Sequence, residues 1–382
     1  MDNKILSEYI NYKEASLKGR YINFNHIAPL LNKYSKQLKL TVVGLSEAKR
    51  PIHLLTIGIG TTKVLAWSQM HGNESTTTRA VFDLLNYLTL SNDAKDILNR
   101  CTIYLIPMLN PDGSQLYTRI NVNKIDLNRD AQLLDQEESK VFKTVVDQIK
   151  PDIAFNLHGQ RTIFSTGNSN NSAIVSFLSP ASDPKRSITA TRKIGMRIIS
   201  EMNKVLQTVI PKNVGRYDDG FNINCTGDTM EKRGVATILF EAGHHPNDYE
   251  RETTRKWIYL ALVTALQFIA RSPNETEGYE AYFDIPENGK CFKDIIIRNL
   301  ILNNSKVDVS IQYQEQLINN QLFFLPYVAE IESQIPDFGH LEFDNNKVAV
   351  SFSKEIQDLQ IDDKIDFLIV GDEKFSEFPI KN

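Results

Sequence analysis

The chain has 382 residues, of which 41% are hydrophobic and 24% charged, so it is long enough for two domains and can bury a sizeable core. Its formal charge is −4 and it has no stripe of Lys and Arg, which argues against a nucleic-acid partner. No apolar run approaches the roughly 18 residues of a membrane span. The N-terminus lacks the apolar stretch of a signal peptide, so we expect a cytoplasmic protein with no membrane partner.

The first forty-odd residues predict short helices, because apolar residues follow helical spacing in "FNHIAPLLNKYSKQL". Apolar runs that end in polar or Gly-rich turns predict strands at 40–45, 52–60, 63–69, 101–109, 151–157, 173–179 and 235–243. Amphipathic segments predict helices at 78–90, 137–149, 190–210 and 251–270. Continuous apolar strands that alternate with helices predict an α/β fold with a mixed, mostly parallel sheet flanked by helices.

The pattern changes after about residue 272, where "RSPNETEG" is typical of a linker. Short alternating segments joined by Asn, Asp and Gly turns follow it and predict strands. We therefore expect an N-terminal helical segment (1–45) that packs on an α/β domain (46–272), and a small, mostly β domain (273–382).

Polar residues follow the predicted strands of the α/β domain. His71 and Glu74, in "MHGNEST", come after one strand, with Glu74 expected in the first turn of the next helix. His158 follows a second strand and Glu241 a third, and carboxyl ends of strands gather ligands at one sheet edge. Taken singly, each residue has an ordinary structural explanation, such as a helix cap or a salt bridge. Together they suit a catalytic zinc site with three ligands and a separate carboxylate base.

The segment "NPDGSQLYTRINVNKIDLNRD" (110–130) starts after a fourth predicted strand and contains Arg119 and Arg129. The planar guanidinium group suits recognition of a carboxylate and stabilisation of an oxyanion. On these residues alone, a surface loop with solvated arginines is the favoured explanation of the segment.

The motifs occur in the order H-x-x-E, N-P-D-G, R-x-N-x-N-x-x-D-L-N-R, a strand that ends in His and a strand that ends in Glu. This order resembles the zinc metallocarboxypeptidases, the carboxypeptidase A- and B-like enzymes also called funnelins. The resemblance covers roughly residues 50–272. It implies a carboxypeptidase-like catalytic domain with one zinc ion per chain, which removes a C-terminal residue from a peptide through a metal-activated water.

The resemblance also implies residue roles in catalysis. His71, Glu74 and His158 would bind zinc. Glu241 would act as the general base and acid. Arg119 would polarise the scissile carbonyl and hold the oxyanion.

Further roles carried over from the family concern substrate binding. Asn128 and Arg129 would hold the terminal carboxylate of the substrate. Asp126 matches the carboxylate that orients the first zinc histidine. Tyr217, in "VGRYDDGFN", is the candidate for a mobile tyrosine that closes over substrate, although an aromatic side chain packed at the base of a loop explains it as well.

The sequence departs from the family pattern at positions that we expect to line the substrate cleft. Gly159 and Gln160 follow the third ligand, where Ser or Thr is usual, and Asp130 follows Arg129, where Asn is usual. His244 and His245 are expected on an exposed loop.

Two other functions remain open. Aspartoacylase and succinylglutamate desuccinylase share the H-x-x-E and D-L-N-R elements, so the substrate is a peptide or an N-acyl amino acid with a free carboxylate. A catalytically inactive peptide-binding module is the third possibility, although no predicted ligand or base is missing.

Overall fold

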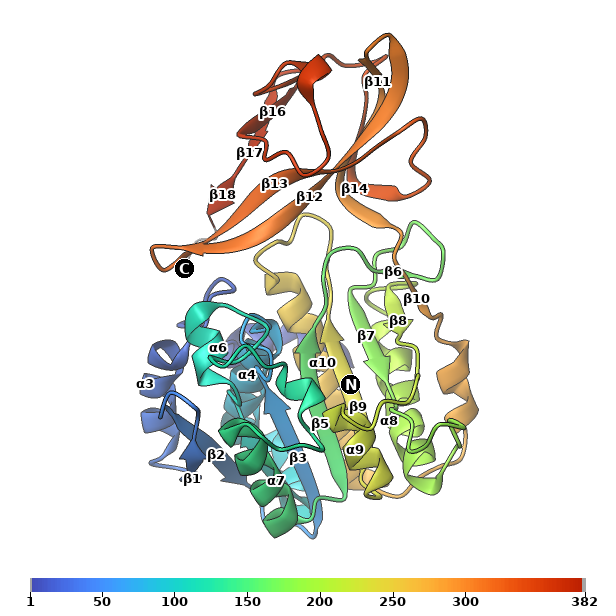
Figure 1. The fold of residues 1–382 in the computed structure, drawn as a ribbon. Coiled ribbons are helices and arrows are strands. Elements are labelled where there is room, and N and C mark those ends of the chain that lie inside the picture. The colour runs from blue at the N-terminus through green and yellow to red at the C-terminus, as the bar shows by residue number, and fades with distance from the viewer. Residues whose placement is uncertain (1, 380–382) are drawn as a thin grey trace.

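A large mixed sheet forms the centre of the computed structural model, which describes residues 2–379 (Figure 1). Its strands are β1 (Lys39–Leu45), β2 (Pro51–Ile57), β3 (Thr62–Ser68), β4 (Cys101–Ile106), β5 (Ile153–Gly159), β7 (Val175–Leu178), β8 (Val214–Arg216) and β9 (Ala236–Ala242). They lie in the order β1-β2-β4-β3-β5-β9-β7-β8, and the adjacent strands β4, β3, β5 and β9 are parallel. The predicted α/β fold with a mixed, mostly parallel sheet is confirmed.

Helices cover both faces of this sheet (Figure 1). One face packs against α4 (Thr76–Leu90), α8 (Ala190–Leu206) and α10 (Glu252–Arg271), and the other against α7 (Glu137–Ile149) and α9 (Thr226–Lys232). In α7 the apolar residues recur at helical spacing, so that Val141, Phe142, Val145, Val146 and Ile149 are all buried on one side. The remaining short helices of this part are α5 (Lys95–Arg100), α6 (Pro111–Leu116), η1 (Asn92–Ala94), η2 (Leu127–Arg129) and η3 (Tyr279–Asp284).

The N-terminal residues pack on α4 and α10 through three helices: α1 (Asp2–Ser7), α2 (Tyr9–Tyr12) and α3 (Phe24–Tyr34). Residues 39–45 form β1 and pair with β2 in the large sheet, which confirms the strand predicted at 40–45. The sheet therefore begins within residues 1–45, the expected N-terminal segment.

The C-terminal residues form two further sheets that share an apolar core. The five-stranded sheet contains β11 (Phe292–Leu302), β12 (Ser305–Ile318), β13 (Gln321–Glu332), β14 (Phe338–Asp344) and β18 (Phe378–Pro379). The three-stranded sheet contains β15 (Val350–Phe352), β16 (Phe367–Val370) and β17 (Glu373–Ser376), with η4 (Ile356–Asp358) beside it. Two short strands, β6 (Ser165–Thr166) and β10 (Asn288–Gly289), pair where the chain crosses from one part to the other.

The C-terminal sheets lie over one end of the α/β part, and the β12–β13 hairpin is the portion of these sheets that faces it (Figure 1). Among residues 2–379, no helix combines the length and hydropathy that crossing a lipid bilayer requires. The limits of the three expected domains remain a prediction.

Candidate active site

The four candidate metal and base residues meet at one edge of the large sheet. His158 and Glu241 are opposite each other in the parallel pair of β5 and β9, and His71 follows the neighbouring strand β3. Glu74 lies in the turn between β3 and α4 instead of in the first helical turn as predicted. The reason is local, because the Glu74 N–H donates to the His71 carbonyl at 3.1 Å and α4 begins only after Ser75.

Three of these side chains converge on a common point. The Nδ1 atom of His71 lies 2.9 Å from Glu74 Oε1, and the Nδ1 atom of His158 lies 2.9 Å from Glu74 Oε2. The two Nδ1 atoms are 3.1 Å apart. Among residues 2–379, His71, Glu74 and His158 form the only His, Cys, Asp and Glu group of this kind, with ligand atoms within 4.8 Å of one another. Two imidazole nitrogens and a carboxylate are the donor set of catalytic zinc sites, so these residues fit zinc.

Asp126 orients the first histidine. Its Oδ1 atom lies 3.1 Å from His71 Nε2 and accepts a hydrogen bond from the Asn128 N–H at 2.9 Å. Its Oδ2 atom accepts a hydrogen bond from Arg119 Nε at 3.1 Å, and Arg119 Nη1 also reaches Glu74 Oε1 at 3.4 Å. The contact with Nε2 leaves Nδ1 of His71 directed at the other two candidate ligands.

The electrostatics of the three ligands follow from this geometry. Burial alone would raise the pKa of the Glu74 carboxyl, but the His71 and His158 rings hold it well below its usual range. Burial alone would lower the pKa of His71, but Glu74 and Asp126 outweigh that effect and raise it. For His158 burial is decisive and lowers the pKa, so this ring favours the neutral form that binds a metal.

Glu241 has the surroundings of a carboxylate held ready for proton transfer. Its Oε2 atom is buried without a hydrogen-bond partner among the described residues. Burial, followed by the nearby Glu74 carboxylate, raises the pKa of Glu241 well above its usual value, while Arg119 and Arg251 act in the opposite direction. A cation bound by His71, Glu74 and His158 would also oppose this increase in the pKa of Glu241.

Asn128 and Arg129 lie side by side on η2. The Asn128 Oδ1 atom accepts the Thr226 N–H at 2.9 Å, which fixes its amide against the start of α9. The guanidinium group of Arg129 is exposed, and its Nη1 atom donates to the Asn128 carbonyl at 2.7 Å and to Cys225 Sγ at 3.1 Å. Arg129 therefore has no carboxylate partner among residues 2–379, and its charge is available to a ligand.

Tyr217 belongs to the same cavity, as predicted. Its N–H donates to the Phe177 carbonyl at 3.0 Å, and its ring lies 5.4 Å from that of Phe164, centroid to centroid. Burial and then the Glu241 carboxylate raise the pKa of its hydroxyl. Tyr217 therefore packs at the base of a loop and also lies near Glu241.

All candidate residues except Asp126 line a cavity of about 640 Å³. Its wall also includes residues that sequence reasoning missed: Arg20, Arg161, Arg251, Asp294, Gln312, Tyr313, Gln314, Glu315 and Phe324. Most of them come from the N-terminal segment or from the C-terminal sheet. No motif or spacing connects such distant segments, so the sequence carried no signal for them.

Two other expectations are wrong. Gly159 and Gln160 line the cavity, but Asp130 does not, because its carboxylate accepts the backbone N–H groups of Asp135 and Gln136 before α7. His244 is buried instead of exposed, and its ring lies 4.7 Å from Tyr249 and 4.4 Å from His340, centroid to centroid.

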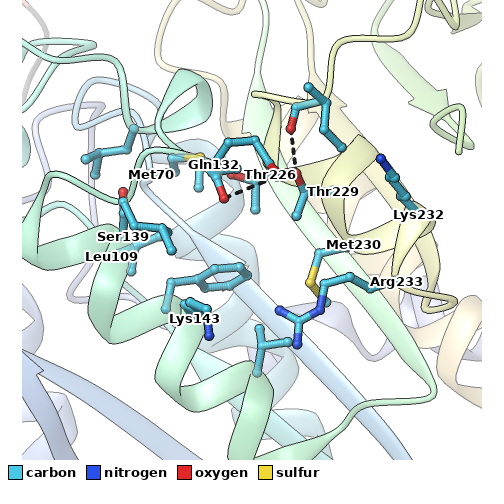
Figure 2. A pocket seen from close by; sticks show the side chains of 16 residues that line it. Met70, Leu109, Gln132, Ser139, Lys143, Thr226, Thr229, Met230, Lys232 and Arg233 are labelled. Atoms are coloured by element: carbon cyan, nitrogen blue, oxygen red, sulfur yellow. Dashed lines mark hydrogen bonds between the residues drawn. The ribbon is translucent and has the colours of Figure 1, made fainter. Parts of the chain in front are cut away.

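A second cavity, of about 480 Å³, lies between α7 and α9 (Figure 2). Apolar side chains such as Met70, Phe142 and Met230 line it, and Lys143 and Arg233 lie at its lower end in this view. It contains none of the candidate metal or base residues. Thr226, which binds Asn128, is the link between the two cavities.

Comparisons with known proteins agree with the resemblance to the zinc carboxypeptidases. A family model described as zinc carboxypeptidase matches residues 25–148. Probable carboxypeptidase 2 of Arthroderma benhamiae is 29% identical over 99 residues, which cover 25% of this chain and 19% of that protein. Carboxypeptidase 2 of Trichophyton rubrum is equally similar, over 18% of its length. The matched segment thus spans about a fifth of these relatives.

Solved structures share the fold. A metallo-carboxypeptidase from Burkholderia cenocepacia has a TM-score of 0.52 at 19% identity, over 64% of this chain and 69% of that chain. A putative carboxypeptidase A from Shewanella denitrificans has a TM-score of 0.55 at 18% identity, over 65% and 69%. A metallo-carboxypeptidase from Pseudomonas aeruginosa, in complex with (2-guanidinoethylmercapto)succinic acid, has a TM-score of 0.52 at 16% identity, over 67% and 70%. The predicted resemblance to zinc metallocarboxypeptidases is confirmed, and the matches support the prediction of a metallopeptidase.

Proposed function

We propose that this chain, which resembles the zinc carboxypeptidases, is a zinc-dependent hydrolase that releases the C-terminal residue of a peptide. The observation that carries the proposal is the convergence of His71 Nδ1, Glu74 and His158 Nδ1 beside Glu241, whose Oε2 atom is buried without a partner among the described residues. A bound zinc ion would supply Lewis acidity, which lowers the pKa of water and polarises a carbonyl oxygen.

The other residues have roles in proton transfer and charge stabilisation. Glu241 takes a proton from the attacking water and passes it to the leaving amine. Arg119, whose side chain is half-exposed in the cavity, donates hydrogen bonds to the carbonyl oxygen as negative charge develops there. Asp126 keeps His71 in the orientation that directs Nδ1 to the metal.

A free carboxylate distinguishes an exopeptidase substrate, and Asn128 and Arg129 are suited to bind it. Arg129 has a guanidinium group without a carboxylate partner among residues 2–379, on the wall of the same cavity. The solved Pseudomonas aeruginosa metallo-carboxypeptidase carries a succinic acid derivative, which is also a carboxylate ligand. Tyr217 closes over the bound substrate.

Metal content and activity together test the proposal. We expect about one zinc ion per wild-type chain and loss of that ion in the Glu74→Ala, His158→Ala double variant. The Glu241→Gln variant should retain zinc and lose hydrolysis of an N-blocked dipeptide. A wild-type chain that stays free of zinc after reconstitution would contradict the proposal and favour an inactive peptide-binding module.

A deacylase of N-acyl amino acids is the second candidate, because residues of the C-terminal sheet line part of the cavity wall and a compact cavity also suits a small acyl group. Comparing an N-blocked dipeptide with an N-acetyl or N-succinyl amino acid separates the two activities. A higher kcat/KM for the acyl amino acid would favour the deacylase. The cytoplasmic location remains a prediction that fractionation of the source cells would test.

A further inference from the structure

The C-terminal sheet contributes directly to the wall of the catalytic cavity. Residues 312–315 of β12, here called the β12 wall, line the cavity together with Asp294 of β11 and Phe324 of β13. The opposite side of the cavity is formed by the ends of the parallel strands, with His158 and Glu241. Figure 1 shows the β12–β13 hairpin across this end of the α/β part.

The β12 wall is held in position by a buried polar network at one end. Asp294 is buried and accepts hydrogen bonds from the Tyr249 hydroxyl at 2.8 Å and from the Tyr313 N–H at 2.7 Å. Gln312 donates from Nε2 to Asp294 and also to Thr162 Oγ1, the latter at 2.8 Å. Tyr249 and Thr162 belong to the α/β part, so this network joins the two parts across the cavity wall.

An ion pair anchors the other end of the wall. Glu315 Oε1 lies 2.7 Å from Arg20 Nη1, and Glu315 Oε2 accepts a hydrogen bond from the Tyr117 hydroxyl at 2.6 Å. Both partners of Glu315 are largely buried. With contacts at both ends, the β12 wall is a fixed boundary of the cavity. Between the anchors, Gln314 is exposed, lines the cavity and makes no side-chain hydrogen bond in the described part of the chain.

We infer that the β12 wall is part of the substrate-binding site and restricts the enzyme to short peptides, with Gln314 as a residue that determines acceptable length. This inference rests on the proposed carboxypeptidase function. With its terminal carboxylate at Arg129 and its scissile bond beside Glu241, a substrate must place its N-terminal side within a cavity of about 640 Å³. Cavities of this size enclose small ligands, and each further residue must pass the β12 wall.

A length series tests the inference with the zinc-reconstituted full chain. The substrates are N-acetylated peptides of two, three, four and six residues that end in the same dipeptide. We expect kcat/KM to fall about tenfold or more between the dipeptide and the hexapeptide, because the additional residues of the hexapeptide would collide with the β12 wall and weaken binding.

Variants of β12 show whether the β12 wall causes the decrease in kcat/KM with peptide length. Gln314→Ala should raise the hexapeptide-to-dipeptide ratio of kcat/KM about threefold or more, and Gln314→Trp should lower it by a similar factor. Gln316→Ala is the matched control, since Gln316 is exposed on the same strand but does not line the cavity, and it should leave the ratio unchanged.

The outcomes separate the inference from the function on which it rests. Equal kcat/KM values for all lengths in the wild type, or equal ratios in all Gln314 variants, would overturn the length restriction while leaving the carboxypeptidase intact. If no peptide of any length is cleaved by the zinc-loaded chain, the proposed function itself is overturned and the inference with it.

Discussion

Asp126 supports the geometry of the candidate metal site, because its carboxylate contacts both His71 and Arg119. The Asp126→Asn variant keeps the size of the side chain and removes its charge. We expect zinc affinity to fall about 10- to 100-fold, since partners of a ligating histidine set its orientation and basicity. Competition with a chromophoric chelator measures the dissociation constant.

Asp135→Asn provides the control for this prediction. Asp135 lies on the same connection before α7, is exposed, and makes no side-chain contact with His71 or Arg119. Its variant should bind zinc as the wild type does. Equal zinc affinities for the Asp126 and Asp135 variants would show that Asp126 does not support the metal site.

Arg129 carries the proposed recognition of the substrate terminus. The Arg129→Gln variant should lose about tenfold or more in kcat/KM for a peptide with a free C-terminal carboxylate, because a hydrogen bond to a charged group is lost. The loss should be much smaller for the same peptide with a C-terminal amide. Steady-state kinetics with the two substrates measure this difference.

Arg161 offers a matched comparison for Arg129. It is an exposed arginine of the same cavity, and in the described residues it makes no hydrogen bond or ion pair. Arg161→Gln should leave the preference for carboxylate over amide close to that of the wild type. If Arg161→Gln abolishes the preference and Arg129→Gln does not, the terminal carboxylate binds elsewhere in the cavity.

At the level of elements, a buried ion pair fastens the N-terminal segment to α4 and α10. Asp83 and Arg255 are both buried, with Arg255 Nη2 2.6 Å and Nε 2.7 Å from the carboxylate. Asp83 also accepts hydrogen bonds from the Tyr9 hydroxyl and the Glu14 N–H, while Arg255 donates to the Leu17 carbonyl. Three separate stretches of chain therefore depend on this pair.

Asp83→Asn should lower the free energy of unfolding by about 3 kcal/mol, because it removes the closest counter-charge of the buried guanidinium group of Arg255 and leaves the carboxylate of Glu252, 3.5 Å from Nη1. Asp147→Asn is the comparison, since Asp147 pairs with Lys143 and Arg233 on the surface and should contribute less than about 1 kcal/mol. Urea unfolding measures both. Similar losses for the two variants would mean that the buried pair does not hold the N-terminal segment.

The regular elements of the α/β part were predictable because their signals are local. The helix at 137–149 has its predicted limits, and each predicted strand of this part has a counterpart in the sheet. His71, His158 and Glu241 were predictable as neighbours because the carboxyl ends of parallel strands meet at one edge. Periodicity and this topological rule together account for the predicted metal cluster.

What sequence reasoning missed depends on contacts between distant segments. Glu315 pairs with Arg20, although the two residues lie at opposite ends of the chain, one before the α/β part and the other in β12. Similarly, His244 is buried because Tyr249 and His340 enclose it, and its neighbours in sequence gave no sign of this. Such packing has no period and no motif. The role of β12 in the cavity wall therefore became visible only in the structure.

At the level of the whole molecule, the junction between the α/β part and the C-terminal sheets contains a carboxyl group sensitive to pH. Asp294 is buried there, and burial raises its pKa to about 6, although the bonds from Tyr313 and Tyr249 partly offset the effect. The usual pKa of an unfolded aspartate is about 3.9. Because the folded-state pKa is the higher one, the contribution of Asp294 to stability is fully present below about pH 4 and is lost as the pH rises through 6.

Comparing the wild type with Asp294→Asn isolates this contribution. The wild type should lose up to about 3 kcal/mol of unfolding free energy relative to the variant between pH 4 and pH 7, since the variant cannot titrate at this position. Urea unfolding of the metal-free proteins measures the difference and avoids the release of zinc in acid. The asparagine can still accept the Tyr313 N–H while its amide faces the Tyr249 hydroxyl.

Asp363→Asn gives a comparison of opposite sign. Asp363 forms an ion pair with Lys354, and the hydrogen bond from Lys354 lowers the pKa of the Asp363 carboxyl. The stability of the wild type relative to this variant should therefore increase as the pH rises. A difference between wild type and Asp294→Asn that stays constant from pH 4 to 7 would mean that burial does not raise the pKa of Asp294. In that case the junction would hold the β12 wall equally firmly in acid and at neutral pH.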